Sequence, residues 1–199
     1  MLTVEVDLAA VERRLADGRL ACPECSSALT GWGHGRSRTV RGPDGPLRVR
    51  PRRSRCLGCG MTHVLLPVTL LLRRADTAVV IGTALAAKAT GTGHRPIAVA
   101  LGRPAGTVRG WLRRFAERAE AVRAVFTVWL RALAPDPVMP DPAGTVLADA
   151  VTAIRAATTA AARRWVMPTV PLWEVAVAIS DGRLLAPGWP MVSINTSSP

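Results

Sequence analysis

The chain lacks any apolar segment long enough to cross a bilayer. The best candidate, Val64 to Leu72, covers nine residues, contains Pro67 and ends at Arg73-Arg74, whereas a membrane-spanning helix needs about 20 apolar residues. The first residues, Met1 to Asp7, show no basic region followed by an apolar stretch, so we expect no export leader. Both absences favour a cytoplasmic protein with no membrane partner.

Acidic residues and lysine are scarce. The 199 residues include 26 basic ones, 25 of them arginine, and only 14 acidic ones, for a formal net charge of +12. Residues 34–59 carry eight basic residues against one acidic, and residues 73–134 carry eleven against three, whereas 1–33 and 135–199 have net charges of −2 and −1. A GC-rich genome would explain the preference for arginine but not this distribution. A basic surface confined to two segments favours a polyanionic partner, usually nucleic acid.

The chain also lacks a recognisable catalytic centre. No Ser/His/Asp cluster, paired-carboxylate site or phosphate-binding glycine loop is present. A transposase would need acidic residues that hold two metal ions, and the last third of the chain is too short for a nuclease fold with a central sheet. The acidic residues available from Asp141 onward are Asp141, Asp149, Glu174 and Asp181. We therefore expect a protein that is not an enzyme and infer no small-molecule substrate.

Cysteine occurs only four times, in two knuckles, Cys22-Pro23-Glu24-Cys25 and Cys56-Leu57-Gly58-Cys59, with thirty residues between them. Two residues between paired thiolates let one tight turn direct both sulfurs at one ion, and two such turns supply the four ligands of a structural zinc. Two disulfides or two redox pairs are the alternatives, and the missing export leader counts against disulfides. We interpret His34 and His63 as ordinary ribbon residues, because Cys22, Cys25, Cys56 and Cys59 already complete a closed zinc site.

The residues around the knuckles predict a zinc ribbon. Ala28 to Trp32 and Leu47 to Arg55 read as extended runs, with a turn at Gly42 to Pro46 between them, and His63 to Leu66 would form a third strand. Gly60 suits the position after the last ligand, where a backbone amide approaches a thiolate closely.

Helical periodicity begins after the ribbon. Asp76 to Lys88 predicts a helix that Asp76 can cap. Residues 94–115 then predict two helices around a short turn, since Pro96 suits a first helical turn and Gly102 can end a helix in the left-handed conformation. The small Ala98 would let the two helices cross closely.

The second of these helices has an apolar stripe and a polar face. The stripe consists of Val108, Trp111, Leu112 and Phe115, which leaves the arginines of this helix facing outward. This is the layout of the recognition helix in a helix-turn-helix. An ordinary helical hairpin with solvated arginines is the alternative, but the neighbouring basic ribbon favours DNA binding.

The pattern of Ala98, Gly102, Val108 and Trp111 resembles the helix-turn-helix of bacterial repressors and transposase DNA-binding regions. Residues 107–115 are similar to homeodomain-like helices of insertion-sequence proteins. Arg50-Pro51-Arg52-Arg53-Ser54-Arg55-Cys56-Leu57-Gly58-Cys59 resembles the amino-terminal zinc ribbon of insertion-sequence transposases, in which a basic strand runs into the second knuckle. The resemblance covers about residues 20–131. Gly106 departs from it, because a capping Ser or Thr is common near that helix start.

Arginine side chains would carry the DNA contacts. Arg109 and Arg113 lie one helical turn apart and would read bases, since a guanidinium can bond guanine in two places. Ribbon arginines, with Arg36, Arg38 and Arg41 among them, would add sequence-independent affinity for phosphates. The expected contacts are Arg103, Thr107, Arg109, Gly110, Arg113 and Arg114 from the helix-turn-helix, and Arg48, Arg50, Arg52, Arg53 and Arg55 from the ribbon.

The predicted fold class is mainly α with a small β zinc ribbon, followed by a homeodomain-like helix-turn-helix bundle and C-terminal helices. Helical periodicity continues to Leu133, and further helices are expected at 145–165 and 171–180. The expected domains are an N-terminal helix (1–19), the zinc ribbon (20–68), the helix-turn-helix domain (73–134), a proline-rich linker (135–142) and a C-terminal helical segment with an irregular tail (143–199).

Together these features predict a sequence-specific, double-stranded DNA-binding protein with structural zinc, associated with the nucleoid. It would serve a mobile element or regulate transcription, and a twofold DNA site would make it a homodimer. Two alternatives stay open: a truncated transposase remnant without its catalytic core, and an RNA-binding zinc-ribbon protein.

Overall fold

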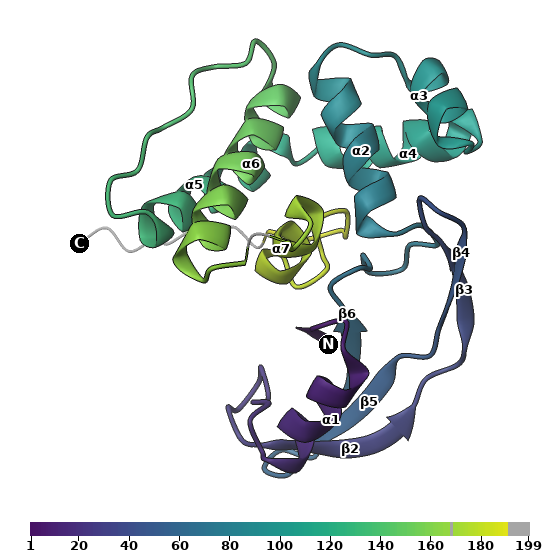
Figure 1. The fold of residues 1–199 in the computed structure, drawn as a ribbon, viewed down its shortest axis with the longest axis vertical. Helices are drawn as coiled ribbons and strands as arrows, with labels where there is room; N and C mark the ends of the chain where they lie inside the picture. The colour runs from purple at the N-terminus through teal and green to yellow at the C-terminus, as the bar shows by residue number, and fades with distance from the viewer. Residues whose placement is uncertain (168, 191–199) are drawn as a thin grey trace.

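The computed structural model describes residues 1–167 and 169–190. Strands dominate the first 67 residues and helices dominate the rest. Figure 1 shows the strands and the first helix in one lobe and the remaining helices in another, with a long β-hairpin running between them along one side.

The larger sheet belongs to the strand-rich lobe, residues 1–67, which we call the ribbon. Its strands are β1 (Leu2–Val4), β2 (Leu29–His34), β5 (Arg52–Cys56) and β6 (Thr62–Pro67), in the order β1-β6-β5-β2. β1 is parallel to β6, and the other pairs are antiparallel. Helix α1 (Leu8–Ala16) packs Val11 and Leu15 onto Leu29 and Leu65 of this sheet, which forms a small separate core.

The region before the first knuckle differs from the expected N-terminal helix over 1–19. A strand, β1, comes first, and α1 begins only after Asp7, whose carboxylate accepts a hydrogen bond from the Ala9 amide at 2.9 Å. Residues 2–4 extend because they pair with Leu65 to Pro67 of β6. That partner lies more than sixty residues away in the chain, so local periodicity could not reveal it.

A hairpin lies in the chain between β2, which follows the first knuckle, and β5, which leads into the second. β3 (Arg38–Arg41) and β4 (Pro46–Val49) form their own two-stranded sheet around the predicted turn. The single run predicted from Leu47 to Arg55 is wrong, since it breaks at Arg50 and Pro51 before β5 begins. Proline has no N–H to donate to a sheet, so the chain changes partner there, and the Pro51 carbonyl accepts a hydrogen bond from the Gly35 amide.

The helical lobe has one large core and a small second cluster formed by Leu133, Ala161 and Val175. Its helices are α2 (Ala78–Ala89), α3 (His94–Leu101), α4 (Ala105–Ala116), α5 (Ala119–Leu133), α6 (Val146–Arg164) and α7 (Leu172–Ile179). Phe115, Phe126 and Ile154 are fully buried in this core, which side chains from all six helices share. Residues after the proline-rich segment 135–142 therefore pack with the helices before it. The described residues form seven helices and six strands, a mixed α/β arrangement, and the mainly-α class is not confirmed.

The helix boundaries around the predicted turn agree with the sequence. α3 ends at Leu101 and is capped by Gly102, which adopts the left-handed conformation (φ 60°), and α4 begins at Ala105. The predicted cap of α2 is wrong: Thr77, not Asp76, accepts the hydrogen bond from the Val80 amide. Asp76 is 2% exposed and bonds to arginines instead.

No helix within residues 1–167 and 169–190 combines the length and the apolar character needed to cross a bilayer.

Candidate metal centre and nucleic-acid interface

The four cysteines converge at one point between the two knuckles. Their Sγ atoms all lie within 4.8 Å of one another, with Cys22 and Cys59 3.8 Å apart and Cys25 and Cys56 3.4 Å apart. A disulfide has an S–S distance of about 2.05 Å, so the four thiols are unbridged. Four sulfurs at about 2.3 Å from a tetrahedral ion lie about 3.8 Å from one another. The cluster therefore has the dimensions of a metal site.

Local backbone turns aim each pair of sulfurs at this point. In the first knuckle, the Ser26 amide donates to the Cys22 carbonyl at 2.9 Å, and Ser26 adopts a positive φ of 60°. In the second, the Gly60 amide donates to the Cys56 carbonyl at 3.2 Å, with Gly60 at φ 73°. The two turns close in the same way, which is why the spacing of two residues could be read from the sequence.

The thiols influence one another's ionisation. A backbone hydrogen bond at Ser27, followed by hydrogen bonds from the Ser27 side chain and two neighbouring thiols, lowers the pKa of Cys25 to about 6. A backbone hydrogen bond at Met61 lowers the pKa of Cys59, but burial and the other three thiols outweigh it and raise that pKa to about 12. Ionising one thiol thus opposes ionising the next, and a divalent cation at the centre would offset this repulsion.

His63 is closer to this centre than the sequence suggested. Its Nε2 lies 3.3 Å from the Cys22 Sγ, and the ring is 4% exposed. Burial is the main cause that lowers the pKa of His63, and a neutral ring with its proton on Nε2 can donate to the Cys22 sulfur. The signal in the sequence is a histidine in the strand directly after the second knuckle.

Helix α4 presents two faces. Val108, Trp111, Leu112 and Phe115 are buried in the core of the helical lobe, as predicted. On the outer face Arg109 is exposed, and the Arg113 side chain is 68% exposed with only a loose contact to Glu117 at 3.8 Å. Gly106 lies on the same open surface, where an added Cβ would meet no atom within 4 Å. Thr107 and Gly110 are half-buried at the edges of this face.

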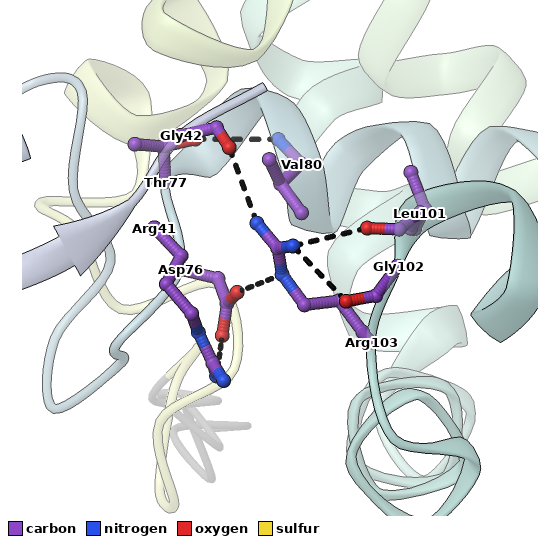
Figure 2. A network of polar contacts seen from close by, with 8 residues as sticks. All are labelled: Arg41, Gly42, Asp76, Thr77, Val80, Leu101, Gly102 and Arg103. Carbon is purple, nitrogen blue, oxygen red and sulfur yellow. Dashed lines mark hydrogen bonds and ion pairs between the residues drawn. The ribbon is translucent and has the colours of Figure 1, made fainter. Parts of the chain in front are cut away.

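Arg103 does not lie on that exposed face. Figure 2 shows its guanidinium enclosed between Asp76, the turn after α3 and the β3–β4 hairpin. Its Nε donates to the Asp76 Oδ1 at 2.6 Å, and its two terminal nitrogens donate to the carbonyls of Leu101, Gly102 and Gly42 at 3.0 to 3.2 Å. The side chain is 14% exposed, so Arg103 joins parts of the protein rather than facing solvent.

Asp76 holds a second arginine, from the hairpin. The Arg41 guanidinium donates to the Asp76 Oδ2 at 2.6 Å. Backbone hydrogen bonds reinforce this contact, because the Arg41 amide donates to the Ala75 carbonyl and the Thr77 amide donates to the Arg41 carbonyl. The tip of the hairpin is thereby fixed against the turn between α3 and α4 (Figures 1 and 2).

Several other expected DNA contacts are engaged within the protein. Arg52 is 15% exposed and bonds to Glu12 at 2.6 Å and to the Gly33 carbonyl at 2.6 Å. Arg55 stays exposed, with its guanidinium over the Trp32 ring at 5.0 Å, and Arg53 is half-buried.

Arg114 is likewise turned toward the protein. It is half-buried and donates to the Gly110 carbonyl at 3.0 Å. Burial first, and then the charges of Arg114 and Arg118, lower the pKa of Arg74, which places these three arginines near one another. Of the expected contacts on α4, Arg109 and Arg113 are therefore the arginines that face outward.

The open end of the β3–β4 hairpin, opposite its tip, forms an exposed basic hollow of about 560 Å³. It is lined by His34, Gly35, Arg36, Ser37, Arg48 and Arg50. Arg48 donates to the Ser37 hydroxyl at 2.9 Å, whereas Arg36 and Arg50 are exposed. A concave surface with three arginines is suited to a phosphate group.

Compared with family models, with curated proteins and with solved structures, the chain shows no match in any of the three.

Proposed function

We propose that the protein is a zinc-dependent, double-stranded DNA-binding protein of the kind that the resemblance to insertion-sequence transposases implies, acting in a mobile element or as a transcription regulator. The observation that supports it most is the attachment of a basic hairpin to the turn that precedes α4, through Asp76. Two basic elements from distant parts of the chain thus belong to one unit.

Zinc is the ion that fits the proposed metal centre. Four thiolates in tetrahedral spacing suit Zn²⁺ better than the harder ions Mg²⁺ and Ca²⁺, which prefer oxygen. Cys22, Cys25, Cys56 and Cys59 would be its ligands, and His63 would orient the Cys22 sulfur. With four protein ligands the ion has no open position, so its role in the proposal is structural.

Helix α4 is the proposed reading element. Its exposed arginines Arg109 and Arg113 lie four residues apart, on the face opposite the buried stripe. A guanidinium can donate two hydrogen bonds to guanine in the major groove. Gly106, the second residue of the helix, has no side chain, which would let the backbone come close to a groove wall at that position.

The hairpin is the proposed phosphate-binding element. The hollow at its open end is lined by Arg36, Arg48 and Arg50. At the other end, the bonds of Arg41 and Arg103 to Asp76 fix the tip of the hairpin beside the turn before α4. Such contacts would hold the protein on the duplex without reading its sequence. Arg103 and Arg52, which were expected to touch DNA, have a positioning role in this proposal.

The test is selection and sequencing of a random duplex pool bound by the zinc-loaded protein. The double variant Arg109→Ala/Arg113→Ala should lose the consensus but keep a salt-dependent affinity. The double variant Arg48→Ala/Arg50→Ala should keep the consensus, and its log–log salt slope should become shallower by about 2, at about 0.9 per phosphate contact. The exposed residues Arg155 and Arg164 of α6, replaced together by alanine, provide a charge-matched control.

Two results would contradict the proposal. If the Arg109/Arg113 variant and the α6 control bind alike, α4 does not read bases. If single-stranded or A-form RNA binds more tightly than duplex DNA at equal salt, the protein belongs to the RNA-binding alternative.

A further inference from the structure

A second feature lies away from the basic surface, where the ribbon meets the last helices. A cavity of about 500 Å³ opens between the N-terminal strand β1 and the helices α5 and α7. Its walls come from both lobes: the residues from Thr3 to Val6 and Arg14 on one side, and Trp129, Trp165 and α7 on the other. This volume is within the range of sites that hold small organic molecules, about 300 to 1,000 Å³.

The cavity gathers large apolar side chains that are left open to solvent. Val6 is 52% exposed, Trp129 37%, Trp165 52% and Val170 38%, and all four line it. Such a concentration of exposed apolar surface costs free energy in water unless a ligand or partner covers it. The indole rings add flat π faces, which attract cations as well as apolar groups.

The charged groups of the cavity leave one carboxylate without a counter-ion. Glu5 and Arg14 neutralise each other through an ion pair at 2.7 Å. Glu174, on the first turn of α7, is half-buried and makes no ion pair or side-chain hydrogen bond within the part of the chain that the structure describes. Burial raises the pKa of Glu174, as expected for a carboxylate that has lost water without gaining a partner.

We propose that this cavity binds a hydrophobic organic monocation, with the cationic group at the Glu174 carboxylate and the apolar body against Trp129 and Trp165. A cation would restore the partner that Glu174 lacks, and aromatic faces next to a carboxylate are a recognised setting for ammonium groups. The cavity has one more acidic than basic residue in its lining, on a chain whose net charge is +12. The charges lining the cavity therefore favour a cation, although the protein as a whole is positively charged.

Binding here would connect the two lobes. The lining includes β1, which pairs with β6 of the ribbon, and α7, which belongs to the core of the helical lobe. A bound molecule would contact both and favour their present arrangement. This proposal does not depend on DNA binding, and neither does its test.

The test uses the full, zinc-loaded chain and a series of probes that share a phenylalkyl body. The cation (4-phenylbutyl)trimethylammonium is compared with neutral 4-phenylbutanol and anionic 5-phenylpentanoate by calorimetry and tryptophan fluorescence. The cation should bind at one site, at least about tenfold more tightly than either of the others. Glu174→Gln should abolish this preference, and Trp165→Ala should weaken binding of the cation.

Asp136→Asn serves as the matched control, since it removes one negative charge at an exposed position outside the cavity and should leave binding of the cation unchanged. Equal affinity for the three probes, or equal losses in Glu174→Gln and Asp136→Asn, would overturn the proposal. Sedimentation at two protein concentrations tests whether a second copy of the chain fills the cavity instead. A dimer that Trp165→Ala dissociates, and that blocks the probe, would assign the cavity to a second copy of the chain and also overturn the proposal.

Discussion

Asp76 shows how much one buried side chain can connect. It is 2% exposed and accepts hydrogen bonds from Arg41 of the hairpin and Arg103 of the turn before α4, both at 2.6 Å. A buried carboxylate between two guanidinium groups is favourable only while both partners are present, because each charge has lost water. The contact is therefore sensitive to removal of its central charge.

We predict that Asp76→Asn lowers the free energy of unfolding by about 3 kcal/mol, since it leaves the 14%-exposed Arg103 without its charged partner. Urea denaturation followed by circular dichroism measures this. Asp44→Asn, at the exposed turn of the same hairpin, should change stability by less than about 0.5 kcal/mol. Equal losses in the two variants would show that the Asp76 contacts contribute nothing.

For Glu174 we predict the opposite effect at neutral pH, because removing its charge should stabilise the protein. Its pKa in the folded protein lies above the ordinary value of 4.5 because of burial. The folded state then binds a proton more tightly than the unfolded state, so stability falls as pH rises from about 4.5 through the raised pKa. Glu174→Gln should therefore melt at a higher temperature than the natural chain at pH 7, and the difference should vanish below about pH 4. A variant that is less stable at pH 7 would contradict this.

At the scale of elements, the Trp173 side chain of α7 packs directly against α2 at Gly82. A Cβ added at Gly82 of α2 would lie 2.0 Å from Cδ2 of Trp173 on α7. Gly82→Ala should therefore cost about 1 to 3 kcal/mol through overpacking, although alanine is the better helix former.

Gly106→Ala on α4 is the matched control, because nothing lies within 4 Å of its added Cβ. It should raise the free energy of unfolding by up to about 1 kcal/mol through helix propensity. Thermal unfolding of both variants tests the pair. A stabilising Gly82→Ala would mean that α7 moves away from α2 at little cost.

Elements also differ in how well local patterns predicted them. α3, α4 and α5 lie close to their predicted positions, since an apolar stripe and a left-handed glycine are properties of neighbouring residues. The strand β1 and the split between β4 and β5 were missed. Each depends on which distant strand is available as a partner, and that is a property of the folded chain.

At the scale of the whole molecule, the two lobes should respond differently to metal removal. The cysteine cluster lies within the ribbon, whereas the core of the helical lobe contains none of its four cysteines. Structural zinc contributes about 10–16 kcal/mol in small zinc peptides, more than the small core under α1 can replace.

We predict that a chelator exposes the backbone amides of residues 20–67 to hydrogen exchange, while amides in α4, α5 and α6 stay protected. The same chelator saturated with zinc is the control. Uniform exchange in both lobes would show that they unfold together, and an unchanged ribbon would show that it needs no metal.

The two cysteine knuckles and the buried and exposed faces of α4 follow from the sequence, because each arises from spacing within a few residues. The partners of the arginines do not. Arg103 and Arg109 are alike in the sequence, yet one is enclosed by Asp76 and Gly42 and the other faces solvent. Tertiary structure decided this, because whether a charge meets a carboxylate or water depends on which distant segments the fold brings beside it.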